Sequence, residues 1–351
     1  MAVIKLKREY FSILFIFFCL FVLFRFPDSA KSGVIKGLEI CLYTIIPSLF
    51  PFMTLSTYIV KSNVLSPFYK VLSFPSRIIF KQPPCTTPVI IMSMIGGFPV
   101  GVKMTNDLYL SKQITEEQAH RLCLFCMNGG PAFVITTVGL SMLGSTKAGI
   151  IIYVSLCISS FLSGVFSSFV ADRKMVFEDK EQHISLPLSS LSAAISDSMQ
   201  SILTICAWVI LFSSATACLS GLNMNDKVFL TICSLMEVTN GCSLLAGKVS
   251  IPIIAGLIGF GGFCIHFQVL TFIKNMNMKY IYFFISRVLN GVFSVIITQI
   301  LLMFFPVETD VFSNFDNTLV YSFSVSLPAF FVVIIMCIIM ILDIDRKKKM
   351  C

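Results

Sequence analysis

The side chains most able to do chemistry in this sequence lie inside apolar segments. Glu237 lies in the stretch MEVTNG, with Asn240 three residues later on the same face of a helix, and Arg287 lies in SRVLNG. An ionisable residue inside a membrane span is costly, so Glu237 and Arg287 are candidate functional residues. Glu237 could bind a proton or cation, hydrogen-bond a solute, or be a structural carboxyl satisfied by backbone amides. Arg287 could pair with a carboxylate or extend its guanidinium to the membrane interface.

Glycine-rich breaks interrupt these apolar segments. GGFPVG begins at Gly96, NGGPAF at Asn128 and GFGGFC at Gly259, and His266 and Gln268 follow the last break. Glycine lowers helix stability and proline removes a backbone donor, so a break inside hydrocarbon requires shelter. Glycines also let backbone amides approach a ligand, and helix N-termini favour anions. We favour Gln268 over His266 as a ligand contact, because a lone histidine usually packs or caps.

The predicted binding set combines the break residues with the polar side chains beside them. Its members are Gly97, Pro99, Gly101, Asn128, Gly129, Gly130, Glu237, Asn240, Gly261, Gly262, Gln268 and Arg287. Lys103 follows the first break and could attract an anion, or it could be an ordinary lysine of a cytosolic loop. Gly149 is expected in an ordinary span without a break.

No constellation expected of a membrane enzyme is present in the sequence. It has no H-E-x-x-H motif, no G-x-S-x-G motif and no paired aspartates in facing spans. The chain has 3 histidines, which argues against a metal hydrolase. The pair Cys123 and Cys126 has no second pair and no nearby histidine, which indicates apolar packing. We therefore expect no catalytic residue, no metal and no cofactor.

Composition places the chain among integral membrane proteins. Apolar residues make up 56% and charged residues 13%, and the mean hydropathy is +0.89. A soluble domain carries about 25% charged residues. The net charge of +8 comes from basic residues gathered between apolar runs, as the positive-inside rule describes. We therefore expect a lipid bilayer around the chain and no nucleic-acid partner.

The apolar runs predict an all-α polytopic fold. Basic residues assign these segments to the cytosolic side: both termini, 61–87, 172–197 and 274–280. The acidic segment 307–320 is assigned outside. These assignments agree only if the interrupted runs near 88–101 and 228–247 each enter and leave on one side as re-entrant hairpins. About eight transmembrane helices are then expected, near 10–27, 36–60, 119–143, 148–171, 198–222, 250–273, 281–306 and 321–343.

The two halves of the chain also resemble each other. LSGVFS at Leu162 returns as LNGVFS at Leu289, and each follows a Gly-Gly break and an interrupted run in the same order. In the predicted topology the first copy begins outside and the second inside, so the repeat is inverted. Inverted repeats with paired broken segments are typical of secondary transporters. The predicted divisions are an N-terminal anchor span (1–30), a first repeat (31–171), a cytosolic linker (172–197), a second repeat (198–306) and a C-terminal span with a basic tail (307–351).

Five stretches then carry a family resemblance. They occur in order as GLEICLYTIIPSLFPFMTLSTYIV from Gly37 to Val60, GGFPVGVK, CMNGGPAFV, LMEVTNG and GFGGFCIHFQ. Together they resemble the sporulation integral membrane protein YlbJ family, within the wider nucleoside-recognition (Gate) domain group. The resemblance covers about residues 30 to 305.

This resemblance implies movement of dipicolinic acid across the outer forespore membrane during sporulation. The residues alone indicate only a multi-pass membrane transporter of a small, anionic solute. Two alternatives stay open: transport of a nucleoside or another small solute, and a non-transporting scaffold that assembles with partner proteins in the sporulation membrane. An oligomer is also compatible with the sequence.

Overall fold

The computed structural model describes residues 20–62, 74–169 and 188–307 except Asn223 and Asn275, together with Phe17 and Val64. Within these residues every regular element is a helix, which confirms the predicted all-α class. Among these described residues, five helical stretches are long and apolar enough to cross a membrane. Half of the first expected span (10–27), most of the 172–197 linker and nearly all of 307–351 lie outside the described residues. The count of eight spans therefore stays a prediction.

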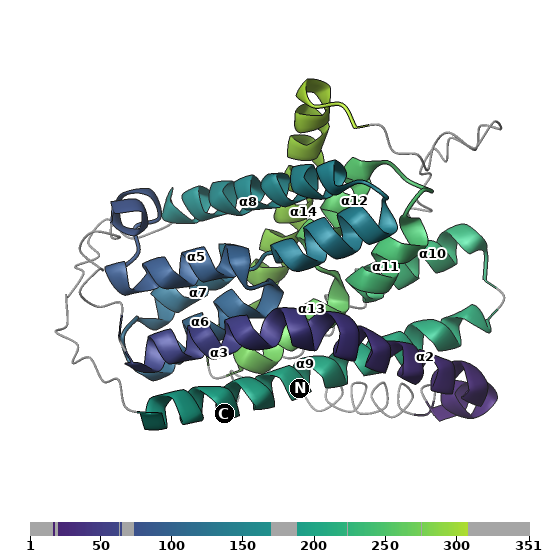
Figure 1. Cartoon of the computed structure of the whole chain (residues 1–351), viewed down its shortest axis with the longest axis horizontal. Helices are drawn as coiled ribbons and strands as arrows, with labels where there is room; N and C mark the ends of the chain where they lie inside the picture. Colours follow the sequence, from purple (N-terminus) through teal and green to yellow (C-terminus); the bar gives the residue numbers. More distant parts are fainter. Residues whose placement is uncertain are drawn as a thin grey trace, which may run out of the picture.

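Long helices form the frame of the protein. The first begins at Pro27, a residue preorganised for an N-terminal helical turn, and continues through a π-helical segment to Ser62. It lies along α9, while α14 packs against α8 and α12 (Figure 1). The long elements are α2 (Pro27–Ile40) continued by η1 (Cys41–Ile45) and α3 (Ile46–Ser62), then α8 (Thr146–Phe169), α9 (Leu188–Ser220) and α14 (Tyr280–Phe304).

Short helices fill the space between the long ones (Figure 1). They come in pairs that are separated by a break of the chain, and the helices within the first and third pairs contact each other. The pairs are α5 (Thr87–Ile95) with α6 (Phe98–Leu110), α7 (Glu116–Phe125) with η5 (Ala132–Met142), α10 (Asp226–Met236) with α11 (Val238–Leu245), and α12 (Ile251–Phe260) with α13 (Gly262–Phe272). The remaining short elements are η3 (Pro75–Ile79) and η4 (Pro84–Thr86).

The breaks follow from local sequence. Gly97 precedes α6 with φ +93°, a left-handed region that favours glycine, and Pro99 stands in the first turn of α6. Gly261 separates α12 from α13 with φ +90°. The run 119–143, expected as one continuous span, is broken between Phe125 and Ala132 by the NGGP stretch.

Both halves show the same order of elements. In each, a long helix is followed by two pairs of short helices and then by a second long helix. The order agrees with the landmarks shared by the two halves of the sequence. The inverted orientation and the boundaries of the five predicted divisions stay predictions.

One glycine lies in a tighter place than expected. Gly149 is on α8, which packs against η5, and a Cβ at this position would lie 2.8 Å from Cα of Ile135 and 2.9 Å from Cα of Gly139. These neighbours are backbone atoms, which cannot rotate away. Gly149 therefore lies in an uninterrupted span, as expected, but the two helices approach so closely at this glycine that a large side chain is not tolerated there.

We predict that Gly149→Leu lowers stability by about 1–3 kcal/mol or more, because the larger side chain forces the two backbones apart. Thermal unfolding and gel filtration of the purified protein measure the effect. Val154→Leu on the same helix is the matched control, since Val154 is 40% exposed. Equal stability of the two variants would show that α8 and η5 can separate freely.

Candidate functional site

The breaks of three helix pairs meet at one open cavity. The cavity and its open mouth hold about 650 Å³ of empty space, and the lining includes Gly97 and Pro99 from the first break and Glu237 from the third. Gly130 and Gln268 complete the set of expected binding residues that line it. Two segments about 140 residues apart in sequence thus face the same space, which is the arrangement that the interrupted runs indicate.

Three helix N-termini border this cavity. Gly97 is the N-cap of α6, Glu237 is the N-cap of α11, and Ala132 is the first residue of η5. A helix N-terminus carries partial positive charge and unsatisfied backbone N–H groups, so it favours anions. The electrostatic field of the three helix ends therefore favours negative charge in the cavity.

Glu237 supplies the one ionisable side chain among the described lining residues. The sequence predicted that Glu237 lies within a helix, on the same face as Asn240. Instead its backbone angles are extended, φ −139° and ψ 118°, and it is the N-cap of α11. Its carboxylate accepts hydrogen bonds from the backbone N–H groups of Thr239 (2.9 Å) and Asn240 (2.7 Å). The side chain is 2% exposed. The carboxylate is thus held by the N-terminus of its own following helix, and one edge faces the cavity.

Two amide side chains accompany Glu237. Gln268 on α13 lines the cavity, and its only hydrogen bond among the described residues runs from Nε2 to Sγ of Cys264 at 3.3 Å. Its carboxamide oxygen is thus left for a ligand. Asn240 lies outside the lining, and its Nδ2 donates to Oγ of Ser213 on α9. It therefore joins α11 to a frame helix.

The glycines bring the breaks into contact with each other. A Cβ on Gly130 would lie 3.1 Å from the backbone N of Gly97, so the second break packs against the first. A Cβ on Gly262 would lie 3.3 Å from the backbone N of Val238, so the fourth break packs in the same way against the third. In each half, the absence of a side chain lets one interrupted segment support the other.

The other predicted glycines serve packing. A Cβ on Gly101 would lie 2.3 Å from the carbonyl oxygen of Cys126, and one on Gly129 would lie 2.8 Å from the Val134 side chain. Gly261 provides the left-handed turn between α12 and α13. None of the three lines the cavity, so they shape the segments that do.

Arg287 binds backbone carbonyl groups at the break between α7 and η5. It is 0% exposed, and its guanidinium donates to the carbonyl oxygens of Met127 (2.7 Å) and Leu124 (3.3 Å) at the end of α7. Ser160 on α8 donates to the carbonyl of Phe125 and to Oδ1 of Asn128. Arg287 and Asn128 therefore lie outside the cavity, and Arg287 neither reaches the membrane interface nor faces the space where a solute would bind.

His266 has a similar role at another helix end. Its Nε2 contacts the carbonyl oxygen of Phe260, the last residue of α12, at 3.0 Å, and aromatic rings surround the imidazole. The preference for Gln268 over His266 therefore agrees with the position of each side chain.

The sequence reasoning missed the contribution of the first long helix. Thr44 and Ser48 bring hydroxyl groups to the cavity beside Phe52, and Thr239 follows Glu237. Thr44 lies in the π-helical segment η1. Such segments frequently occur at functional sites, but nothing in the letters LYTIIPS distinguishes a π-helical turn from an α-helical one.

The groups that line the cavity are of the kinds that hydrogen-bond to a small solute and pack against it. Among the described residues, no group of three His, Cys, Asp or Glu side chains could hold a metal ion. The cavity offers backbone N–H groups, hydroxyls, an amide oxygen, aromatic rings and one carboxylate. These groups suit recognition of a solute that has both polar and planar apolar parts.

Comparisons with known proteins place the chain among membrane proteins. No family model and no solved structure matches it. It is 25% identical to the sporulation integral membrane protein YlbJ of Bacillus subtilis (strain 168), with 78% of each chain covered. This similarity confirms the resemblance identified from the five sequence stretches and agrees with a multi-pass integral membrane protein. The wider nucleoside-recognition group is compatible with this result and stays a prediction.

We predict that Arg287→Lys destabilises the protein, because an ammonium group cannot reach both carbonyls with the guanidinium geometry. A buried acceptor left unpaired costs about 1–3 kcal/mol. Thermal unfolding in detergent measures this loss, and Lys279→Met, at an exposed position beside α14, is the control. A variant of unchanged stability that binds solute poorly would instead make Arg287 a ligand contact.

Proposed function

Because the chain belongs to the YlbJ family of sporulation integral membrane proteins, we propose that it carries a small anionic solute across a membrane. One observation carries this proposal: two interrupted segments from different halves of the chain meet at a single open cavity. Broken helices at equivalent positions that face a common binding space are the architecture of secondary carriers.

An anion suits the helix ends around the cavity. The N-termini of α6 and η5 border it, and helix N-termini bind carboxylates and phosphates. The N–H groups of Thr239 and Asn240 at the start of α11 are already hydrogen-bonded to Glu237. Phe52, Phe98 and Phe133 supply apolar faces in the lining. We propose dipicolinic acid, a planar aromatic dicarboxylic acid, as the solute, and the outer forespore membrane during sporulation as the place of transport. Both proposals rest on the family resemblance.

The position of Glu237 constrains how an anion can enter. The described lining contains no Lys, Arg or His, so a bound anion would face the carboxylate without a neutralising side chain. Two like charges in a low-dielectric cavity repel strongly. We therefore propose that a proton or another cation is carried with the anion and that Glu237 binds it.

A neutral solute is the second candidate, and the same lining favours it. Without a basic side chain, the cavity presents the hydroxyls of Ser48 and Thr239, the amide of Gln268 and the carboxylate of Glu237, all of which hydrogen-bond uncharged polar groups. A nucleoside, with its hydroxyl-bearing sugar and planar base, fits this chemistry. It needs no counter-charge.

Uptake into lipid vesicles separates the candidates. The purified full chain is reconstituted and supplied with labelled dipicolinate or a labelled nucleoside, with and without a pH gradient. We expect saturable uptake of dipicolinate that an inward proton gradient or a cation accelerates. Saturable uptake of the nucleoside alone would favour the second candidate, and no uptake of either would favour a scaffold that assembles sporulation proteins.

We predict that Glu237→Gln removes coupling while the protein still folds. Glutamine keeps an acceptor oxygen for the α11 backbone, so the loss of stability is about 1 kcal/mol. Dipicolinate uptake driven by the gradient falls by roughly 5- to 150-fold, the usual range of coupling between two ligands. Glu39→Gln, the same change on an exposed face of α2, is the control. Normal driven uptake by the Glu237 variant would return this carboxylate to a purely structural role.

A further inference from the structure

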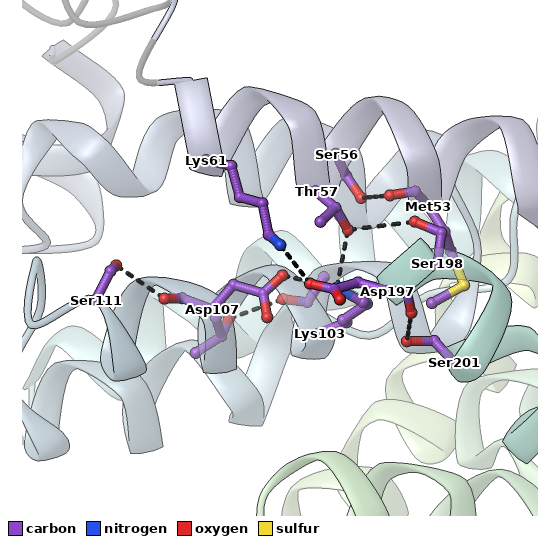
Figure 2. A network of polar contacts seen from close by, with 12 residues as sticks. Met53, Ser56, Thr57, Lys61, Lys103, Asp107, Ser111, Asp197, Ser198 and Ser201 are labelled. Atoms are coloured by element: carbon purple, nitrogen blue, oxygen red, sulfur yellow. Dashed lines mark hydrogen bonds and ion pairs between the residues drawn. The ribbon is translucent and has the colours of Figure 1, made fainter. Parts of the chain in front are cut away.

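A cluster of charged side chains joins three helices at one end of the protein. Lys103 on α6 donates to Oγ1 of Thr57 on α3 at 2.8 Å and forms an ion pair with Asp107 at 2.8 Å (Figure 2). Lys61 on α3 pairs with Asp197 on α9 at 2.5 Å, and this pair lies beside Lys103 and Asp107 (Figure 2). The four charges therefore form one cluster.

The burial of Lys103 differs from that of a loop lysine. Lys103 is 4% exposed and lies inside α6. Of the two interpretations of this residue, the one that made it an ordinary lysine of a cytosolic loop is therefore wrong. Lys61 and Asp197 are more open, with side chains 34% and 47% exposed. Oγ of Ser198, the residue after Asp197, lies 3.5 Å from Oγ1 of Thr57. This contact links α9 to the buried part of the cluster.

The charge cluster lies beyond the cavity along each of its helices. On α3, Phe52 lines the cavity and Thr57 contacts the cluster. The five residues between these positions correspond to about 7.5 Å of helix rise. On α6 the cluster follows Pro99 by four residues at Lys103. On α9 it precedes Ile205 by seven residues at Ser198.

The helical turns between the cavity and the charge cluster are closed by apolar side chains. Met53 on α3 and Val102 on α6 are 0% exposed, and Ile202 on α9 is 1% exposed. These three buried side chains lie between the cavity residues and the charge cluster on their helices. The cluster therefore lies on the far side of a layer that contains buried apolar side chains.

We propose that the Lys61–Asp197 ion pair, which joins α3 to α9, and the hydrogen bond from Lys103 to Thr57, which joins α6 to α3, form a gate that closes the cavity at the end where α3 and α6 finish and α9 begins. Asp107, one turn along α6, holds the Lys103 ammonium in place. A carrier must expose its site to one side of the membrane at a time, so the proposal rests on the transport function proposed above. Partly buried ion pairs add little net stability because desolvation opposes their attraction, but they fix one arrangement of the elements they join. Separation of α3 from α9 and α6 breaks the Lys61–Asp197 ion pair and the hydrogen bond from Lys103 to Thr57, and it opens the cavity.

Thiol labelling of a cavity residue tests the gate without measuring transport. Ser48→Cys places a thiol in the cavity lining, and a membrane-impermeant thiosulfonate reagent is applied to each side of vesicles in turn. The parent chain reports the background from native cysteines. We expect slow labelling from the side of the charge cluster. Lys61→Asp should increase this rate about tenfold, by raising the population of the open state, and Lys61→Asp with Asp197→Lys should restore the slow rate.

Asp226→Lys, a charge reversal at an exposed position at the start of α10, is the control and should leave the labelling rate unchanged. Asp107→Asn provides a second variant that removes charge from the buried part of the cluster, and it should also accelerate labelling. Rapid labelling of Ser48→Cys from the side of the charge cluster while the cluster is intact would overturn the gate. A double exchange of Lys61 and Asp197 that fails to restore slow labelling would also overturn it. Gated labelling in a protein that moves no solute would leave the gate in place and reject the carrier.

Discussion

A chain that breaks its helices inside a bilayer must supply a partner for each backbone group that the break releases. Here side chains from other elements reach the broken ends. Tyr153 donates to the carbonyl of Met94 near the end of α5, Arg287 reaches the end of α7, and His266 contacts the last carbonyl of α12. Glu237 satisfies the first N–H groups of α11. The cavity depends on these four contacts, because without them the interrupted segments would be too costly to bury.

Two of the buried charges, Glu237 and Arg287, follow helix polarity. Glu237 lies at a helix N-terminus, where the dipole favours an anion, and Arg287 lies beside the end of α7, where it favours a cation. Each charge is therefore compatible with a dry interior without direct pairing to the other. Only Glu237 also borders the cavity, so a second charge that enters the cavity affects Glu237 first.

The positions of the breaks could be predicted from sequence, because glycine and proline act locally through backbone freedom and a missing donor. Gly97, Gly130, Glu237 and Gln268 were expected to meet, and they line one cavity. The role of Arg287 could not be predicted, because its partners are carbonyl groups 160 and 163 residues away. Every residue has a backbone carbonyl, so such a partner cannot be identified from residue types, whereas a carboxylate partner would appear in the sequence as an Asp or a Glu.

For the same reason the sequence misjudged glycines. Gly101 lies in a break and Gly149 lies in an uninterrupted apolar run, so the sequence suggests different roles for them. In the structure both glycines allow a close approach of backbones. Lys103 was ambiguous because burial of a lysine depends on Thr57 and Asp107, and only the fold brings Thr57 close. Local rules thus locate the interruptions, while the contacts that stabilise them are tertiary.

The length of α14 has a consequence for the surrounding lipid. Its 25 residues extend over about 37 Å, and the hydrocarbon core of a bilayer is about 30 Å thick. A straight helix of this length fits if it tilts by about 35°. Met303, Phe304 and Phe305 at its end are 71%, 73% and 57% exposed, in keeping with a terminus at the lipid headgroups. A thinner membrane would require a larger tilt of α14 and would press on α8 and α12, so bilayer thickness acts as a mechanical load on this protein.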